Sequence, residues 1–214
     1  MKKIFVLVTL FVMPVVIYLF FASGVTNFGK LALLTENVPE LDFSPGNVRL
    51  ADKITILGFL GNDVRHQQAQ AFNLNQKIYK RFYPFNDFQL VMVMPKGTEG
   101  QVEELERELS GFTDVQKWNF VYGDETEIRE LFSGLRTDLA LDSTLGTPYV
   151  FIIDKQRNLR GRKDDSDEGV KYGFNTLSVA DLNNKMEDDV KIILAEYRMA
   201  LKKNNADRNY NAKE

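Results

Sequence analysis

The chain has 214 residues, with 27 basic and 30 acidic side chains, one histidine and no cysteine. Its net charge of −3 argues against a nucleic-acid-binding surface, and its 44% of hydrophobic residues excludes wholesale disorder. Without cysteine the chain has no disulfide, no thiol redox chemistry and no thiolate metal ligand. A single histidine, His66, also excludes a metal site built from several histidines of one chain.

The N-terminal segment predicts a membrane anchor. Lys2 and Lys3 precede the uncharged residues 4–21, which as a helix would span roughly 27 Å, close to the thickness of a bilayer core. Because the lysines come first, the N-terminus is expected in the cytoplasm and the rest of the chain on the exported side. A cleaved signal peptide with small residues at 22–24 is the alternative, but its apolar region is usually only about 7–15 residues long. We therefore expect residues 1–24 to be a single-pass signal-anchor in the inner membrane, carrying a periplasmic domain.

Three further regions are predicted after the anchor. Residues 25–40 are expected to form a juxtamembrane stem, and residues 41–203 a single domain. The domain is expected to open with two short strands at 41–43 and 48–50. The Asn-rich residues 204–214 lack an apolar pattern and predict a disordered tail.

The body of the chain alternates strands with helices. Strands are predicted where apolar and β-branched residues run together, at 54–60, 88–94, 118–122 and 149–153. Helices are predicted where apolar residues recur every three to four positions, at 63–82, 98–109, 124–132 and 178–203. Residues 158–162 are expected to pair with the last strand as a hairpin, residues 163–176 to form a polar loop, and Ser178 and Asp181 to form a capping box. This order predicts an α/β domain with helices packed on a central mixed sheet.

An ordered set of motifs gives a more specific expectation. The motifs are VPELDF at 38–43, a buried strand ending at Phe59, WNF at 118–120, IID at 152–154 with LRG at 159–161, and DDSD at 164–167. Together they resemble the Sco/SenC family, the membrane-tethered assembly factors of cytochrome c oxidase. The resemblance covers roughly residues 38–168 and implies a thioredoxin-like fold.

The chain departs from that family at its copper and redox site. The family has two cysteines spaced CxxxC after the first buried strand, and a distant histidine. Alignment on the end of the strand puts Asn62 and His66 at the cysteine positions and Gly146 near the histidine position. Two thiolates and an imidazole suit copper, whereas an amide, one imidazole and a glycine do not. The resemblance therefore implies a degenerate member without thiol exchange, in which Thr147-Pro148 resembles the cis-proline segment of thioredoxin folds.

Several polar residues allow two interpretations. His66 could be a remnant metal ligand, although a surface position in the first turn of a helix is favoured. Met92 and Met94 could be soft copper ligands, but as members of a buried strand they fit the core better. The acidic residues of 164–168 could bind Ca²⁺, but they lack the EF-hand spacing and favour a solvated loop. The glutamates of 99–108 are most simply the wet face of a helix.

The sequence thus favours a non-enzymatic, membrane-anchored binding or scaffold protein. By resemblance, its partner would be a respiratory complex or one of its assembly factors. A weak copper carrier that uses His66, and an enzyme with thiol-independent chemistry, are the alternatives. No catalytic residue and no cofactor is assigned, since there is neither a phosphate-binding glycine motif nor a nucleophile elbow.

Overall fold

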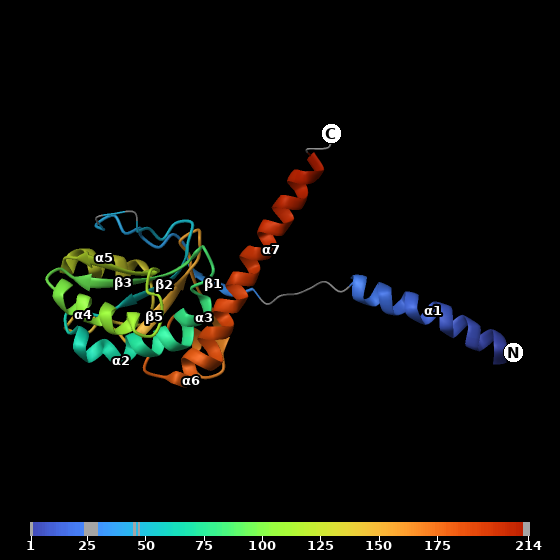
Figure 1. The fold of residues 1–214 in the computed structure, drawn as a ribbon, viewed down its shortest axis with the longest axis horizontal. Helices are drawn as coiled ribbons and strands as arrows, with labels where there is room; N and C mark the ends of the chain where they lie inside the picture. The colour runs from blue at the N-terminus through green and yellow to red at the C-terminus, as the bar shows by residue number, and fades with distance from the viewer. Residues whose placement is uncertain (1, 24–29, 45, 47, 212–214) are drawn as a thin grey trace.

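A mixed sheet lies between two layers of helices in the computed structural model (Figure 1). The structure describes residues 2–23, 30–44, 46 and 48–211, with side chains except at 2–8, 20–23 and 201–211. The strands are β1 (Ala32–Thr35), β2 (Ile54–Phe59), β3 (Phe88–Pro95), β4 (Trp118–Gly123), β5 (Tyr149–Ile153), β6 (Leu159–Asp165), β7 (Gly169–Lys171) and β8 (Phe174–Asn175). The predicted buried strands and hairpin are therefore confirmed.

The sheet has the strand order β1-β6-β5-β2-β3-β4. Strands β2, β3 and β4 run parallel, because a helical connection returns the chain to the same end of the sheet before each new strand. Strand β5 runs antiparallel to β2, and β6 runs antiparallel to both β5 and β1. The short strands β7 and β8 pair with β6 and β5 respectively. The expected central mixed sheet is confirmed.

The helices cover both faces of this sheet. They are α2 (Val64–Leu74), a π-helical turn η1 (Asn75–Tyr79), α3 (Lys80–Phe82), α4 (Glu99–Ser110), α5 (Glu125–Gly134), α6 (Val179–Asp181), a π-helical turn η2 (Leu182–Met186) and α7 (Glu187–Asn211). One buried cluster joins apolar residues of α2, α4, η2 and α7 to the sheet. The other joins α5 and the segment 38–50 to the opposite face. The apolar stripes in the sequence therefore faced the core as predicted.

Capping contacts fix where two of the helices begin. Asp124 and Glu127 form a reciprocal capping box at the start of α5, with N···O distances of 3.0 and 2.8 Å. Ser178 accepts from the backbone N–H of Asp181 at 3.2 Å. The Asp181 carboxylate instead accepts from the backbone N–H of Asn175 at 2.7 Å, so the predicted box is half formed.

The domain begins earlier than predicted. Strand β1 falls within residues 25–40, which were expected to be a stem, and it pairs with β6. The Arg160 guanidinium donates two hydrogen bonds to the Leu31 carbonyl, and Thr35 Oγ1 donates to the Leu135 carbonyl at 2.7 Å. These contacts are long-range in sequence, so the short run of residues 31–35 gave no local sign of them.

Two other expectations about loops were wrong. Residues 41–43 and 48–50 form no strand; the Glu40 carboxylate instead accepts from the backbone N–H groups of Leu41, Leu50 and Ala51 and fixes a turn. The predicted polar loop 163–176 contains the end of β6 and all of β7 and β8. Its polar side chains find ionic partners within the fold, described below, which makes short strands compatible with a hydrophilic sequence.

The chain ends are helical where the structure describes them. α1 (Lys2–Ser23) contains Pro14. Among the described residues, no helix combines the length and apolarity needed to span a membrane. At the other end, α7 continues to Asn211 through much of the predicted disordered tail, whose residues 212–214 lie outside the described part.

Candidate functional site

The junction between β2 and α2 is where the resemblance placed a functional site. Gly61 turns the chain there with φ +69°, a conformation that suits glycine. A side chain at Gly61 would meet the Oγ1 of Thr144 at 2.7 Å and its carbonyl oxygen at 2.8 Å. Asp63 then caps α2, because its carboxylate accepts from the backbone N–H of His66 at 3.3 Å.

The structure brings two of the three predicted site positions close together. The backbone N–H of Asn62 donates to the Thr144 carbonyl at 2.9 Å, and Leu60 forms an antiparallel bridge with Gly146. The loop before β5 thus lies directly against the start of α2. Backbone atoms of the two segments are in direct contact there.

His66 points away from this junction. Its side chain is 86% exposed, and its Nδ1 lies 2.7 Å from the Asp63 carboxylate. The residue of α2 that faces Gly146 is Gln67, whose Nε2 is 3.4 Å from where a Cβ on Gly146 would lie. His66 and Gly146 are therefore not arranged as two parts of one binding site.

The donor set does not fit copper or another metal ion. Met92 and Met94 are both buried on one face of β3 and cannot join the exposed His66. Among the described residues, no group of three or more histidine, aspartate or glutamate side chains is placed to hold a metal ion. A lone imidazole paired with one carboxylate is too few ligands for a tight site.

Asp142 organises the loop that carries Gly146. Its carboxylate accepts from the N–H and hydroxyl of Thr144, at 2.8 and 2.6 Å, and from the N–H of Gly146 at 2.9 Å. Burial acts to raise the pKa of Asp142, but these hydrogen bonds outweigh it and hold the pKa below its ordinary value. Sequence reasoning missed this residue, although Asp followed two positions later by Thr is typical of an Asx turn.

Amide and hydroxyl groups lie next to this loop in a connected chain. Gln70 donates from Nε2 to the Oε1 of Gln67. The Thr176 hydroxyl lies 3.2 Å from the Gln70 Oε1 and 2.7 Å from the Pro148 carbonyl oxygen. These groups satisfy one another and include no thiol, no base and no acid, so they are suited to holding the structure rather than to catalysis.

Pro148 differs from the cis-proline of the resemblance. The described residues contain no cis peptide bond, so Thr147-Pro148 is trans. Trans is the intrinsically preferred form of an X-Pro bond. The Pro148 carbonyl also accepts from the Thr176 backbone N–H at 2.9 Å, which continues the pairing of β5 with β8.

A cleft beside the start of α2 is small. It lies between α2 and α4, has a volume of about 190 Å³, and is lined by residues that include Arg65, Gln68, Glu104 and Glu108. Arg65 and Glu104 already face each other across it, 3.3 Å apart. Sites for small molecules usually measure about 300–1,000 Å³ and are mainly apolar, so this cleft is a poor substrate pocket.

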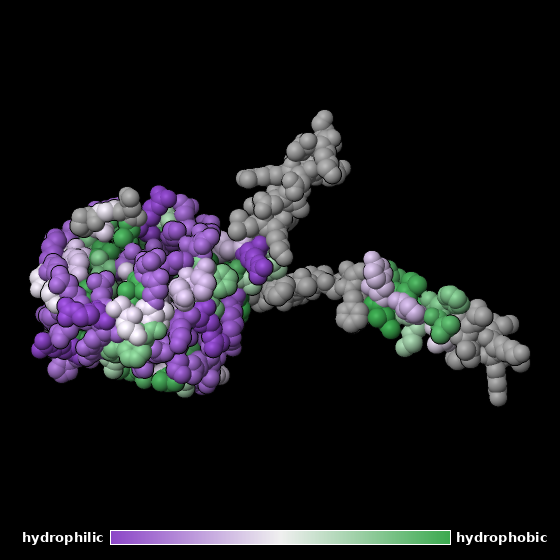
Figure 2. Space-filling view, in the orientation of Figure 1, coloured by the Kyte–Doolittle hydropathy of each residue, from purple (hydrophilic) through white to green (hydrophobic). Residues whose placement is uncertain are grey.

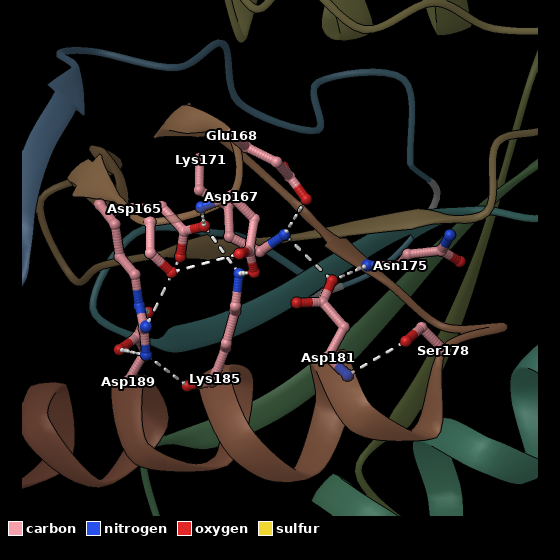
Figure 3. A network of polar contacts seen from close by, with 11 residues as sticks. Asp165, Asp167, Glu168, Lys171, Asn175, Ser178, Asp181, Lys185 and Asp189 are labelled. Carbon is pink, nitrogen blue, oxygen red and sulfur yellow. Dashed lines mark hydrogen bonds and ion pairs between the residues drawn. The ribbon is translucent and has the colours of Figure 1, made fainter.

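The acidic segment at the end of β6 forms a second polar cluster (Figure 3). The Lys185 ammonium lies 2.6 Å from Asp165 and 2.7 Å from Asp167. The Asp165 side chain is only 2% exposed, so the expectation of a solvated loop was wrong for this residue. Burial acts to raise the pKa of Asp165, but the Lys185 contact and backbone hydrogen bonds outweigh it and lower the pKa.

Further ion pairs extend this cluster. Arg162 binds Asp189 through two 2.8 Å hydrogen bonds, and burial nevertheless raises the pKa of Asp189. The fully buried Lys171 ammonium lies between Glu168 and Asp181 (Figure 3). The acidic side chains are thus neutralised by the chain's own cations, which tie β6 and β7 to the last helical segment. At Asp165, the Lys185 ammonium already supplies the neutralising cation.

Comparison with known proteins identifies solved structures of similar fold. No family model and no curated protein matches the sequence. A solved structure of a candidate electron transport protein from Aquifex aeolicus is similar, with a TM-score of 0.51, 17% identity, and coverage of 75% of this chain and 96% of that one. A candidate protein disulfide isomerase from Bacteroides thetaiotaomicron has a TM-score of 0.52 and 13% identity, over 80% of this chain and 98% of that one.

A SCO1/SenC family lipoprotein from Bacillus anthracis is also among the similar structures. Its TM-score is 0.48, with 16% identity over 78% of this chain and 96% of that one. At such identities these similarities show the fold alone. The two structures with TM-scores above 0.5, taken with the sheet order, confirm the predicted thioredoxin-like fold in a chain of 214 residues without cysteine.

Proposed function

We propose that this chain is a membrane-anchored thioredoxin-fold protein that acts by binding other proteins, in the assembly of respiratory complexes such as cytochrome oxidase. The observation that carries the proposal is the junction of β2 and α2. There, Asn62 and Gly146 are held by backbone contacts, and Gln67 and Gln70 are bonded to each other. A thioredoxin-like frame has been kept while the reactive positions hold groups that do neither redox nor nucleophilic chemistry.

The apolar N-terminal segment supports a role at a membrane. The uncharged residues 4–21 follow Lys2 and Lys3. Large hydrophobic side chains at the successive positions 10–13 and 15–19 of α1 are exposed, so they lie all round the helix. Much of the coloured part of this helix is green in Figure 2. A helix that is apolar all round is typical of a segment surrounded by lipid or by protein. Tethering in the inner membrane, with the domain in the periplasm, would raise the local concentration for membrane partners.

The nature of the partner comes from the resemblance to Sco/SenC proteins over roughly residues 38–168. Those proteins assist the assembly of cytochrome c oxidase, a membrane complex. A chain that kept their frame without their metal and thiol ligands is expected to keep protein contacts rather than copper delivery. The partner is therefore proposed to be a respiratory complex or an assembly factor.

Affinity capture tests this proposal. The tagged full chain is expressed in its native host, and the membranes are solubilised in mild detergent before capture on the tag. An unrelated single-pass protein with the same tag, treated in the same way, is the control. Enrichment of respiratory or assembly proteins over the control is expected. Recovery of none of them would contradict the proposal.

A His66→Ala variant separates binding from copper carriage. Because the His66 side chain is exposed and paired with Asp63, its loss is expected to leave capture unchanged. In parallel, the wild type and the variant are titrated with Cu(I) and Cu(II). Saturable copper binding that disappears in His66→Ala, together with loss of capture, would favour a copper carrier instead.

A further inference from the structure

One edge of the sheet is open. β4 ends the strand order and pairs only with β3 among the described strands. The Lys117 carbonyl accepts from Leu90 N–H at 2.8 Å, and the Gly123 carbonyl accepts from Lys96 N–H at 3.0 Å. Both carbonyls therefore point toward β3. Backbone groups alternate in direction along a strand, so those of Phe120 and Tyr122 point outward.

These outward backbone groups have no hydrogen-bond partner within the described residues. The two residues form no bond outside the ladder with β3, whereas Trp118 N–H is satisfied by the Val115 carbonyl at 2.9 Å. Phe120 and Tyr122 are half-buried and pack at the margin of the α4 face of the sheet. Unpaired strand edges of this kind can template the addition of another strand.

A stripe of three glutamates runs along α4 beside this edge. Glu99, Glu103 and Glu106 are spaced four and three residues apart, so they share one side of the helix. Among the described residues, none of the three lies within ion-pair distance of a cation. Glu104, on another side of α4, instead pairs with Arg65 at 3.3 Å.

The stripe acts electrostatically on β4. Burial raises the pKa of Tyr122 to about 12, and the charges of Glu106, Glu99 and Glu103 add to this effect. The outer edge of β4 therefore lies in the negative electrostatic potential of these three carboxylates. Such a field attracts cations and repels a second acidic surface.

We propose that the outer edge of β4 and the glutamate stripe of α4 bind an extended, basic segment of a partner protein as an added strand. Residues on one face of a strand repeat about every 6.7 Å, and helix positions four apart repeat about every 6 Å. Lysine or arginine at alternate positions of the added strand can thus meet successive carboxylates of the stripe. Main-chain hydrogen bonds to Phe120 and Tyr122 set the register.

A second copy of this chain fits the edge less well. If β4 paired with β4 of another copy about a two-fold axis, the sheet would continue and both α4 helices would lie on one face. The two stripes of Glu99, Glu103 and Glu106 would then approach each other with like charge. The charge pattern favours a basic partner, and this inference rests on the proposed binding role.

The test uses the full chain in detergent micelles and a blocked eight-residue peptide of alternating lysine and valine. Fluorescence anisotropy at low salt is expected to show saturable binding. The triple variant E99Q/E103Q/E106Q is expected to bind about tenfold more weakly, because two exposed ion pairs and one half-buried ion pair are lost. A charge-matched control on other surfaces, E36Q/E125Q/E130Q, is expected to bind as the wild type does. Equal weakening by both variants would overturn the proposal.

Strand addition is tested separately from charge. Bound peptide is expected to slow amide hydrogen exchange at Phe120 and Tyr122, and a peptide N-methylated at alternate residues is expected to lose binding. Unchanged exchange at both amides, or full binding by the methylated peptide, would overturn strand addition. Protection of these amides without peptide, in a dimer, would assign the edge to a second copy.

The outcome is distinguishable from that of the proposed function. If affinity capture finds no respiratory protein while the peptide still binds β4, the proposed partner class fails and the surface stands. If the E99Q/E103Q/E106Q variant still captures the respiratory partner in full, the surface assignment fails and the proposed function stands.

Discussion

Lys171 offers the sharpest test of how the last helical segment is held to the sheet. Its buried ammonium lies 2.8 Å from Glu168, 3.1 Å from Asp181 and 5.4 Å from the centre of the Phe174 ring. The change Lys171→Met keeps the length and the apolar stem and removes the charge. The methionine can pack against Phe174, so the cost isolates the ionic contacts.

The magnitude follows from the exposure of the two carboxylates. Glu168 is 48% exposed and can be rehydrated, so loss of its ion pair is expected to cost less than about 1 kcal/mol of unfolding free energy. Asp181 is 10% exposed, and breaking a buried pair typically costs about 3–5 kcal/mol. Asp181 keeps the Asn175 N–H donor at 2.7 Å, which reduces that loss. We expect Lys171→Met to lower the free energy of unfolding by about 2–3 kcal/mol.

Urea denaturation of the full chain in detergent measures this change. Lys163→Met, at an exposed position of β6, is the matched control and is expected to change the unfolding free energy by less than about 0.5 kcal/mol. Adding Asp181→Asn to Lys171→Met is expected to cost less than the sum of the single changes, because the unpaired charge is removed as well. If Lys171→Met is no more costly than Lys163→Met, the reasoning is refuted.

Two further predictions concern the turn at Gly61 and the acid stability of the domain. Gly61→Ala is expected to destabilise the domain by more than about 1 kcal/mol. The control is Gly97→Ala, which also has a positive φ (+94°) but has open space around it, so its cost is expected to be smaller. Equal thermal shifts for the two variants would refute the clash with the loop before β5. The pKa values of Asp165 and Asp167 lie below 3.8 in the folded chain, so the Lys185 contact contributes fully above about pH 4 and is lost as pH falls through the folded values. Lys185→Met is therefore expected to flatten the fall of melting temperature in acid, and an unchanged slope would contradict this.

Local patterns in the sequence predicted most of the fold. The apolar runs at 54–60 and 88–94 became central strands because buried parallel strands need continuous apolarity. The predicted helix at 124–132 starts where α5 does, because the capping contact of Asp124 with Glu127 joins residues only three positions apart. Such features depend on neighbours in sequence, and sequence patterns contain that information.

The expectations that were wrong depended on partners distant in sequence. β1 is held by Arg160, more than a hundred residues away. Asp165 lies in an acidic run that suggested a loop, yet it is buried and paired with Lys185 and Arg162. Charge alone does not reveal where its partner lies.

Of the three predicted site positions, the structure brings Asn62 and Gly146 together and leaves His66 apart. The resemblance placed Asn62 and Gly146 near each other, and their neighbours Thr144 and Leu60 do connect them. It also assigned His66, whereas Gln67 is the side chain that faces Gly146. A difference of one residue on a helix turns a side chain by about 100°, and alignment on a strand end does not fix that angle.

The central claim is tested most directly by measuring how much assembled cytochrome oxidase is present in the membranes of cells that lack this chain. Haem spectra and oxidase activity are compared after return of the wild type or of His66→Ala. The account predicts a loss of oxidase without the chain and equal rescue by both forms, since the role is binding and the His66 imidazole takes no part. No loss of oxidase, or rescue by the wild type alone, would contradict it.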